Sequence, residues 1–146
     1  MNYELVDLGP LTITGIALRT DNSEAGLAKI QQHWAQFFQQ GILQQIGAGE
    51  STPICEAYFD YESDASGSYT LLLGSRLSGA MPSHVDGVQT HSFPAARYAK
   101  FHVEDSNGIR AAWQHIWSRQ DLDRLYACDF EIIGAEGADI YVSVKS

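Results

Sequence analysis

The sequence predicts an α+β fold, a duplicated β-α-β-β motif with pseudo-twofold symmetry, in which an antiparallel sheet and two helices enclose a central cleft. Two observations lead to this fold class. The segments 54–58 (ICEAY) and 127–131 (ACDFE) match in kind at a constant spacing of 73 residues, the spacing from Cys55 to Cys128. Each is followed by a turn that contains glycine and by a second β-rich run, which is typical of a β-hairpin.

The first half starts with a β-rich run at 11–18 and continues into a helix over about residues 24–40. Residues 20–23 (TDNS) are rich in N-cap residue types. A hairpin follows, with its turn at 62–67 and its second strand at 69–73. The helix is predicted from one apolar stripe with helical spacing, formed by Leu27, Ile30, Trp34, Phe37 and Phe38.

The second half repeats this order. A β-rich run at 96–103 precedes the N-cap residues of 105–107 and a helix over about residues 107–118. The second hairpin has its turn at 134–137 and its last strand at 140–144. The apolar stripe of this helix consists of Ile109, Ala112, Trp113, Ile116 and Trp117.

We therefore expect one domain over 1–146, with half repeats at about 1–77 and 86–146 and a link at 77–84 that contains Gly, Pro and Ser. A single β-α-β-β unit cannot bury both its sheet and its helix stripe well. Two units related by a pseudo-twofold axis can, and the seam between them is a natural place for a cleft.

Composition narrows the classes of function. The chain carries 18 acidic and 9 basic residues, a formal charge of −9, which argues against direct DNA binding because DNA-binding proteins need a basic face. No apolar run approaches the roughly 20 residues that span a membrane. The N-terminus has no basic stretch followed by a long apolar run, so we expect no signal peptide and a cytoplasmic protein.

The cysteines and histidines predict neither a metal site nor a cofactor. Cys55 and Cys128 are expected to be buried as small apolar groups, and no Cys or His spacing is typical of zinc ligands. The five histidines are scattered along the chain.

The strand at 128–133 presents two different faces, because alternate residues of a strand point to opposite sides. Cys128, Phe130 and Ile132 form an apolar face. Asp129, Glu131 and Ile133 form the other face, on which Glu131 has Tyr58 as its equivalent in the first half. If that face points inward, Glu131 and Tyr58 lie opposite each other at the seam. We expect Asp129 to be exposed or paired with an arginine such as Arg124.

The sequence resembles the GyrI-like, AraC-type effector-binding domain, a multidrug-binding module of bacterial transcription regulators. The resemblance covers nearly the whole chain in the family's order. It is carried by EAYFDY at 56–61, YTLLLG at 69–74, FPAARYAKF at 93–101, the helical segment 113–117 and YACDFE at 126–131. No helix-turn-helix region is left over, because the two halves use the whole length, so we expect a stand-alone form.

The resemblance implies a cleft that takes hydrophobic, often cationic, small molecules, with Glu131 as the counter-charge of the ligand. It also implies aromatic walls, for which the candidates are Tyr58, Tyr69, Trp113 and Tyr141. Ile133 is a further candidate for ligand binding, because it shares the strand face of Glu131. Burying a carboxylate costs several kcal/mol unless a positive charge compensates it, and a ligand cation would supply that positive charge. The other stripe residues Trp34, Phe37, Phe38 and Trp117 are expected in the core more often than in the cleft.

Two other functions stay open at this stage. Some relatives of the resembled family are described as hydrolases of reactive electrophilic toxins, and Glu131 with Tyr58 or Tyr141 could activate water or protonate a leaving group. The acidic charge also allows an interaction role, as a gyrase partner or gyrase inhibitor. A transcription regulator is a further possible partner of a ligand-binding module.

Overall fold

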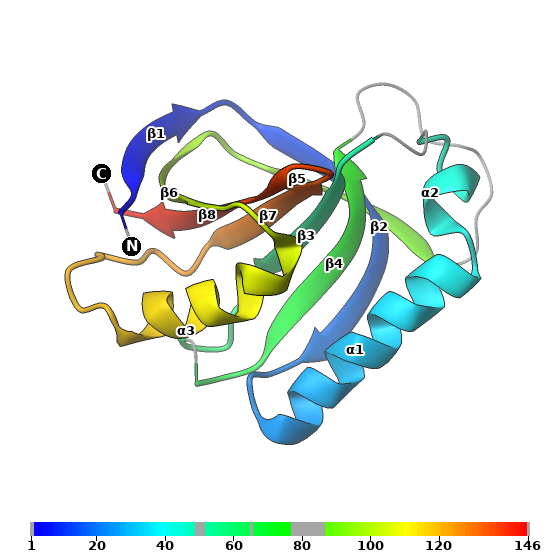
Figure 1. Ribbon diagram of the computed structural model, residues 1–146, viewed down its shortest axis with the longest axis horizontal. Coiled ribbons are helices and arrows are strands. Elements are labelled where there is room, and N and C mark those ends of the chain that lie inside the picture. The colour runs from blue at the N-terminus through cyan, green and yellow to red at the C-terminus, as the bar shows by residue number, and fades with distance from the viewer. Residues whose placement is uncertain (1, 49–51, 65, 77–86, 146) are drawn as a thin grey trace.

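The computed structural model describes residues 2–48, 52–64, 66–76 and 87–145 (Figure 1). The predicted link at 77–84 lies outside them. A short 3-10 turn, Ser106–Gly108, precedes the last helix. The other elements are, in chain order, β1 (Glu4–Leu8), β2 (Leu11–Thr20), α1 (Glu24–Gln39), α2 (Ile42–Gln45), β3 (Ile54–Phe59), β4 (Tyr69–Arg76), β5 (Val88–Phe93), β6 (Ala96–Val103), α3 (Ile109–Ser118), β7 (Cys128–Gly134) and β8 (Gly137–Val144).

The structure confirms the α+β class and the two β-α-β-β units, which are β2-α1-β3-β4 and β6-α3-β7-β8. All strands join one antiparallel sheet in the order β1-β6-β8-β7-β3-β4-β2-β5. The two units meet where β3 pairs with β7, and Ala57 lies opposite Phe130 at the middle of that pairing. These two residues are also 73 positions apart, as the repeat requires, so the pseudo-twofold axis passes through this pair.

The edge strands β1 and β5 complete the sheet, and the repeat had not predicted them. β1 directly precedes β2 along the chain but pairs with β6 of the other unit. β5 directly precedes β6 but pairs with β2. Each unit therefore receives its edge strand from the chain segment that leads into the other unit. The two halves are therefore joined by strand pairing at both edges of the sheet as well as at the central seam.

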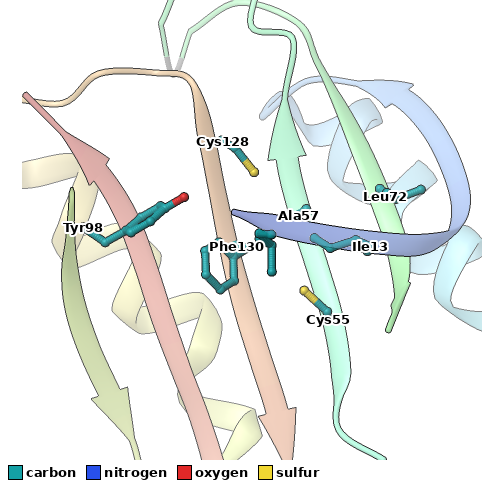
Figure 2. Packing of buried hydrophobic residues seen from close by; sticks show 8 residues of the cluster. Ile13, Cys55, Ala57, Leu72, Tyr98, Cys128 and Phe130 are labelled. Atoms are coloured by element: carbon teal, nitrogen blue, oxygen red, sulfur yellow. The ribbon is translucent and has the colours of Figure 1, made fainter. Parts of the chain in front are cut away.

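One face of the sheet holds an apolar core that spans the seam (Figure 2). Cys55 and Ala57 of β3 and Cys128 and Phe130 of β7 are all buried there. Side chains from the outer strands pack against them, namely Leu11, Ile13, Leu72 and Tyr98. The predicted apolar face of the strand at 128–133 and the predicted burial of both cysteines are confirmed.

Helices α1 and α3 lie on the opposite face of the sheet (Figure 1), where α1 packs against β2 and α3 against β6. Both predicted helices are confirmed. The Ser23 hydroxyl caps α1 by accepting a hydrogen bond from the Gly26 amide at 3.0 Å. Each helix covers the outer part of its own half. The central strands β3 and β7 are therefore left as the floor of a space between the helices. Among the described helices, none has the length and apolar character needed to cross a membrane.

Candidate ligand-binding cleft

A cleft of approximately 530 Å³ opens between α1 and α3 above the central strands. Its surface is mainly aromatic and aliphatic, with a few polar side chains, which is the composition of a small-molecule site. The aromatic residues that line it are Trp34, Phe38, Tyr58, Tyr61, Tyr69, Trp113 and Trp117. All three tryptophans of the chain are in this set.

The two helices supply matching walls. Ile30, Trp34 and Phe38 of α1 follow one another at steps of four residues, and so do the cleft-lining residues Ile109, Trp113 and Trp117 of α3. The apolar stripe of each helix is wide enough that one edge faces the sheet while the other edge faces the cleft. The expectation of a core position was therefore wrong for Phe38 and Trp117, which line the cleft and are 61% and 40% exposed. Trp34 lines the cleft and also packs against the core.

Strands β3 and β7 build the floor. Alternation along β3 turns Ile54, Glu56 and Tyr58 toward the cleft, and Ile133 of β7 joins them. The Tyr58 ring packs edge-on against Tyr69 and Trp113, with ring centroids 5.6 and 5.3 Å apart. The structure thus brings four of the six candidate residues from the sequence to the cleft surface, namely Tyr58, Tyr69, Trp113 and Ile133.

Tyr141 does not line this cleft. It lies on β8 directly opposite Phe130, and its ring stacks on the Phe130 ring with centroids 4.5 Å apart. Directly opposed residues of an antiparallel pair share a face, so Tyr141 belongs to the apolar face that Phe130 occupies. The sheet separates it from the cleft, and the expectation that Tyr141 forms an aromatic wall is corrected.

Glu131 lies just behind the cleft surface, beside a second glutamate. It is directly opposite Glu56 in the β3–β7 pairing, and the two residues are 0% and 4% exposed. Glu56 lines the cleft. Glu131 does not, but two residues that line it, Tyr58 and Trp113, donate hydrogen bonds to Glu131. We call Glu56 and Glu131 the carboxylate pair.

Three donors serve the four oxygens of the carboxylate pair. The Trp34 indole N–H donates to Glu56 Oε2 at 2.8 Å, and the Trp113 indole N–H donates to Glu131 Oε2. The Tyr58 hydroxyl lies 2.9 Å from Glu56 Oε1 and 2.8 Å from Glu131 Oε2, and its single proton serves one of them at a time. Within the described residues, Glu131 Oε1 has no hydrogen-bond partner.

The surroundings disfavour charge on Glu131. Burial raises its pKa well above the usual glutamate range, and the neighbouring Glu56 carboxylate raises it further. Burial, followed by the two glutamates, also raises the pKa of Tyr58 well above its ordinary value, so its hydroxyl keeps its proton. In the described part of the chain, no lysine or arginine forms an ion pair with either glutamate.

Asp129, two residues before Glu131, has very different surroundings. It is fully buried, so the expectation that it is exposed was wrong, but the alternative pairing with Arg124 is confirmed at 2.8 Å. It also accepts hydrogen bonds from the Tyr61 hydroxyl at 2.5 Å and from the Ser143 amide and hydroxyl at 2.7 and 2.9 Å. We call these four residues the Asp129 cluster.

Comparison with known proteins identifies the family. The sequence profile of the GyrI-like small molecule binding domain matches residues 1–142. The chain belongs to this family. A search of curated proteins found no match. The domain therefore belongs to a family of small-molecule binding proteins, and the resemblance stated from its motifs is confirmed.

Solved structures share the fold of this GyrI-like domain. An integron cassette protein from the mobile metagenome of Vibrio cholerae has a TM-score of 0.79 at 20% identity, over 99% of this chain and 97% of that one. SAV2435, solved bound to tetraphenylphosphonium, has a TM-score of 0.73 at 18% identity, over 100% and 95%. The C-terminal domain of EcmrR has a TM-score of 0.58 at 12% identity, over 100% and 99%. At these identities the likeness concerns the fold.

Reasoning from the sequence missed Glu56 as a member of the GyrI-like cleft. The repeat makes Tyr58 the equivalent of Glu131, but antiparallel pairing around Ala57 and Phe130 places Glu56, not Tyr58, directly opposite Glu131. The signal was present in the shared strand face of Glu56 and Tyr58. No group of three or more His, Cys, Asp or Glu residues suited to a metal ion occurs in the part of the chain that the structure describes.

Proposed function

We propose that this GyrI-like domain binds hydrophobic organic cations in the cleft between α1 and α3. The observation that carries the proposal is a buried carboxylate pair beneath an aromatic cleft, to which no lysine or arginine of the described residues is bonded. Such a pair is costly unless a positive charge or a proton compensates it. SAV2435, which shares the fold, was solved with the organic cation tetraphenylphosphonium bound.

The walls of the cleft suit ligands of varied shape. Apolar contact stabilises a bound molecule in proportion to the area removed from water and does not require one outline. The aromatic faces add cation–π attraction, roughly 0.5–2 kcal/mol per ring when the charge is desolvated. Two arginines also line the cleft, but Arg124 is neutralised by Asp129 and Arg110 is exposed at the rim. The carboxylate pair therefore determines the sign of charge that the floor prefers.

We further propose that ligand binding serves sensing or sequestration, and that a transcription regulator is the partner that receives the signal. EcmrR, whose C-terminal domain shares this fold, was also solved in a complex with DNA, and this chain spans 57% of that longer chain. The acidic charge of −9 supports a role in which another protein contacts the DNA.

Fluorescence titration tests the proposal directly, because all three tryptophans line the cleft. Tetraphenylphosphonium is expected to quench the emission saturably and to raise the melting temperature, since it binds the folded state. Triphenylphosphine oxide, a neutral molecule with similar rings, is expected to bind at least tenfold more weakly. Equal affinity for both molecules, or no binding of either, would overturn the proposal. A separate incubation with a reactive electrophilic compound distinguishes binding from hydrolysis. Recovery of the unchanged compound indicates binding, and appearance of its hydrolysis products indicates an enzyme.

Variants assign the preference to the carboxylate pair. The double variant Glu56→Gln/Glu131→Gln keeps the size of both side chains but removes both negative charges. It is expected to lose the preference for the cation over the neutral molecule. Glu136→Gln is the matched control, because Glu136 is exposed in the turn between β7 and β8, and its affinities are expected to equal those of the wild type. A double variant that still prefers the cation would contradict the assignment.

A further inference from the structure

The carboxylate pair has too few hydrogen-bond donors for two charges. Trp34, Trp113 and Tyr58 each supply one proton, and Glu131 Oε1 is left without a donor in the described residues. The nearest carboxylate is that of Glu56, directly opposite on β3, and it has no proton of its own to donate when ionised. A single proton held between the two carboxylates would supply the missing hydrogen bond and remove one of the two buried charges.

Charged and titratable groups on the neighbouring elements do not remove the need for that proton. Arg124 forms an ion pair with Asp129 on β7, and Arg110 of α3 is exposed. Burial raises the pKa of the Cys55 thiol and of the Tyr58 and Tyr69 hydroxyls, so these groups stay neutral. Two further charges act on these groups: Arg76 lowers the pKa of Cys55, and Asp21 raises the pKa of Tyr69.

The two glutamates occupy different depths. Glu56 lines the cleft and can contact a ligand directly. Glu131 lies behind Tyr58 and Trp113 and is completely buried. Like charges at adjacent buried positions cannot both ionise without compensation, which is why one carboxyl of such a pair retains a proton. The raised pKa of Glu131, caused by burial and by Glu56, agrees with this division.

We propose that the carboxylate pair holds one proton in the empty cleft and releases it to solvent when an organic cation binds against Glu56. This proposal rests on the proposed binding function. The step is balanced in charge: the site exchanges one proton, bound between Glu56 and Glu131, for one positive charge on the ligand. Cation binding is therefore coupled to proton release, and affinity for cations depends on pH while affinity for neutral molecules does not.

The coupling has a defined sign and an upper limit. At pH values where the pair holds its proton, each proton released per ligand makes the association constant rise with pH by up to about tenfold per unit. The dependence ends at the pH where the empty pair already ionises. Tetraphenylphosphonium carries a permanent charge and has no titratable group, so any proton released on its binding comes from the protein.

Titration calorimetry of the wild type with tetraphenylphosphonium, in phosphate and in Tris at pH 6, 7 and 8, counts the protons. The binding enthalpies in the two buffers are expected to differ by the proton number times the difference in buffer ionisation enthalpy, with up to one proton released per ligand. Binding with equal enthalpies in both buffers and a flat pH profile would overturn the coupling while leaving the binding function intact. No binding in any condition would overturn the binding function itself.

Glu131→Gln locates the proton. The amide can donate to Glu56 permanently, so the variant is expected to bind tetraphenylphosphonium with no proton release and with affinity that is constant from pH 6 to 8. Continued proton release in this variant would overturn the assignment to the pair. Glu136→Gln serves again as the control and is expected to release as many protons as the wild type. The buffer comparison on the wild type stands even if a variant fails to fold.

Discussion

Asp129 and Glu131 are two residues apart on the same face of β7, and both are fully buried, yet their surroundings are opposite. Asp129 has an arginine, a tyrosine hydroxyl and two donors of Ser143 around its carboxylate. Glu131 has one tyrosine, one tryptophan and another glutamate. The first carboxylate is compensated within the protein, and the second is not.

The difference shows how one strand face can contain a structural carboxylate and a carboxylate that we propose compensates a ligand's charge. A buried carboxylate needs a counter-charge and hydrogen-bond donors. Where the chain supplies both, the carboxylate is compatible with a stable fold as long as none of its partners is removed. Where the chain supplies neither in full, the site holds a proton or attracts a cation. The Asp129 cluster and the carboxylate pair represent these two cases.

Asp129→Asn is expected to have the largest effect on stability. The change removes the negative charge opposite Arg124, whose side chain is only 9% exposed, and disturbs the bonds to Tyr61 and Ser143. Breaking a buried ion pair on one side costs about 3–5 kcal/mol. Urea denaturation at pH 7 measures the loss of unfolding free energy.

Glu136→Gln is the control for that measurement and is expected to change the free energy of unfolding by less than about 0.5 kcal/mol, as exposed substitutions do. An Asp129→Asn variant as stable as Glu136→Gln would remove the contrast between the two buried acids.

Glu131→Gln is expected to change stability in the opposite direction. Because the pKa of Glu131 in the folded protein is well above 4.5, the folded state keeps a proton at pH values where the unfolded chain has lost it. The contribution of Glu131 to the wild-type free energy of unfolding therefore falls as pH rises above 4.5, by about 1.4 kcal/mol per pH unit, until the folded group ionises too. The variant lacks this loss and is expected to be the more stable protein at pH 7.

Urea denaturation of Glu131→Gln and wild type from pH 4.5 upward measures the divergence of their stabilities. Two parallel curves over that range would mean that Glu131 holds no extra proton in the folded state, and the contrast with Asp129 would then lie in geometry alone.

Tyr58→Phe is expected to have the smallest of the three effects, a loss of about 1 kcal/mol of stability, because one hydroxyl shared by two carboxylates is removed. Affinity for tetraphenylphosphonium should also change, since this ring is part of the cleft floor. Thermal unfolding and fluorescence titration measure the two quantities.

Tyr141→Phe is the matched control on the other face of the sheet, where the Tyr141 ring stacks on Phe130. Neither stability nor cation affinity is expected to change appreciably. A Tyr141→Phe variant that loses cation binding would place the ligand on the face opposite the cleft.

Much of the fold was predictable because the signals are local. Strand alternation separated the apolar face of Cys128 and Phe130 from the acidic face of Asp129 and Glu131, and the structure confirms this separation. The helical stripes predicted α1 and α3. The exchange of β1 and β5 was not predictable in the same way, because each pairs with a strand of the other unit and no local pattern encodes that partner.

The cleft was predictable only in part, for a related reason. The repeat spacing indicates which residues are equivalent, here Tyr58 and Glu131, but equivalence about a twofold axis is not contact. The antiparallel register places Glu56 opposite Glu131, and this position creates the carboxylate pair. The apolar stripe of each helix is likewise wide enough to contact both the sheet and the cleft. The stripe alone therefore does not predict which aromatic side chains face the sheet and which face the cleft.

The sequence by itself determined the two faces of the central strands, the two helices and the duplication, because these depend on periodicities of two and 3.6 residues and on a repeat within one chain. Only the tertiary structure decided the roles of the two acids of β7. Arg124, Tyr61 and Ser143 reach Asp129 from three separate segments, while Glu131 receives Glu56 from across the seam. A carboxylate's charge state depends on such neighbours in space, and the order of residues along the chain does not specify them.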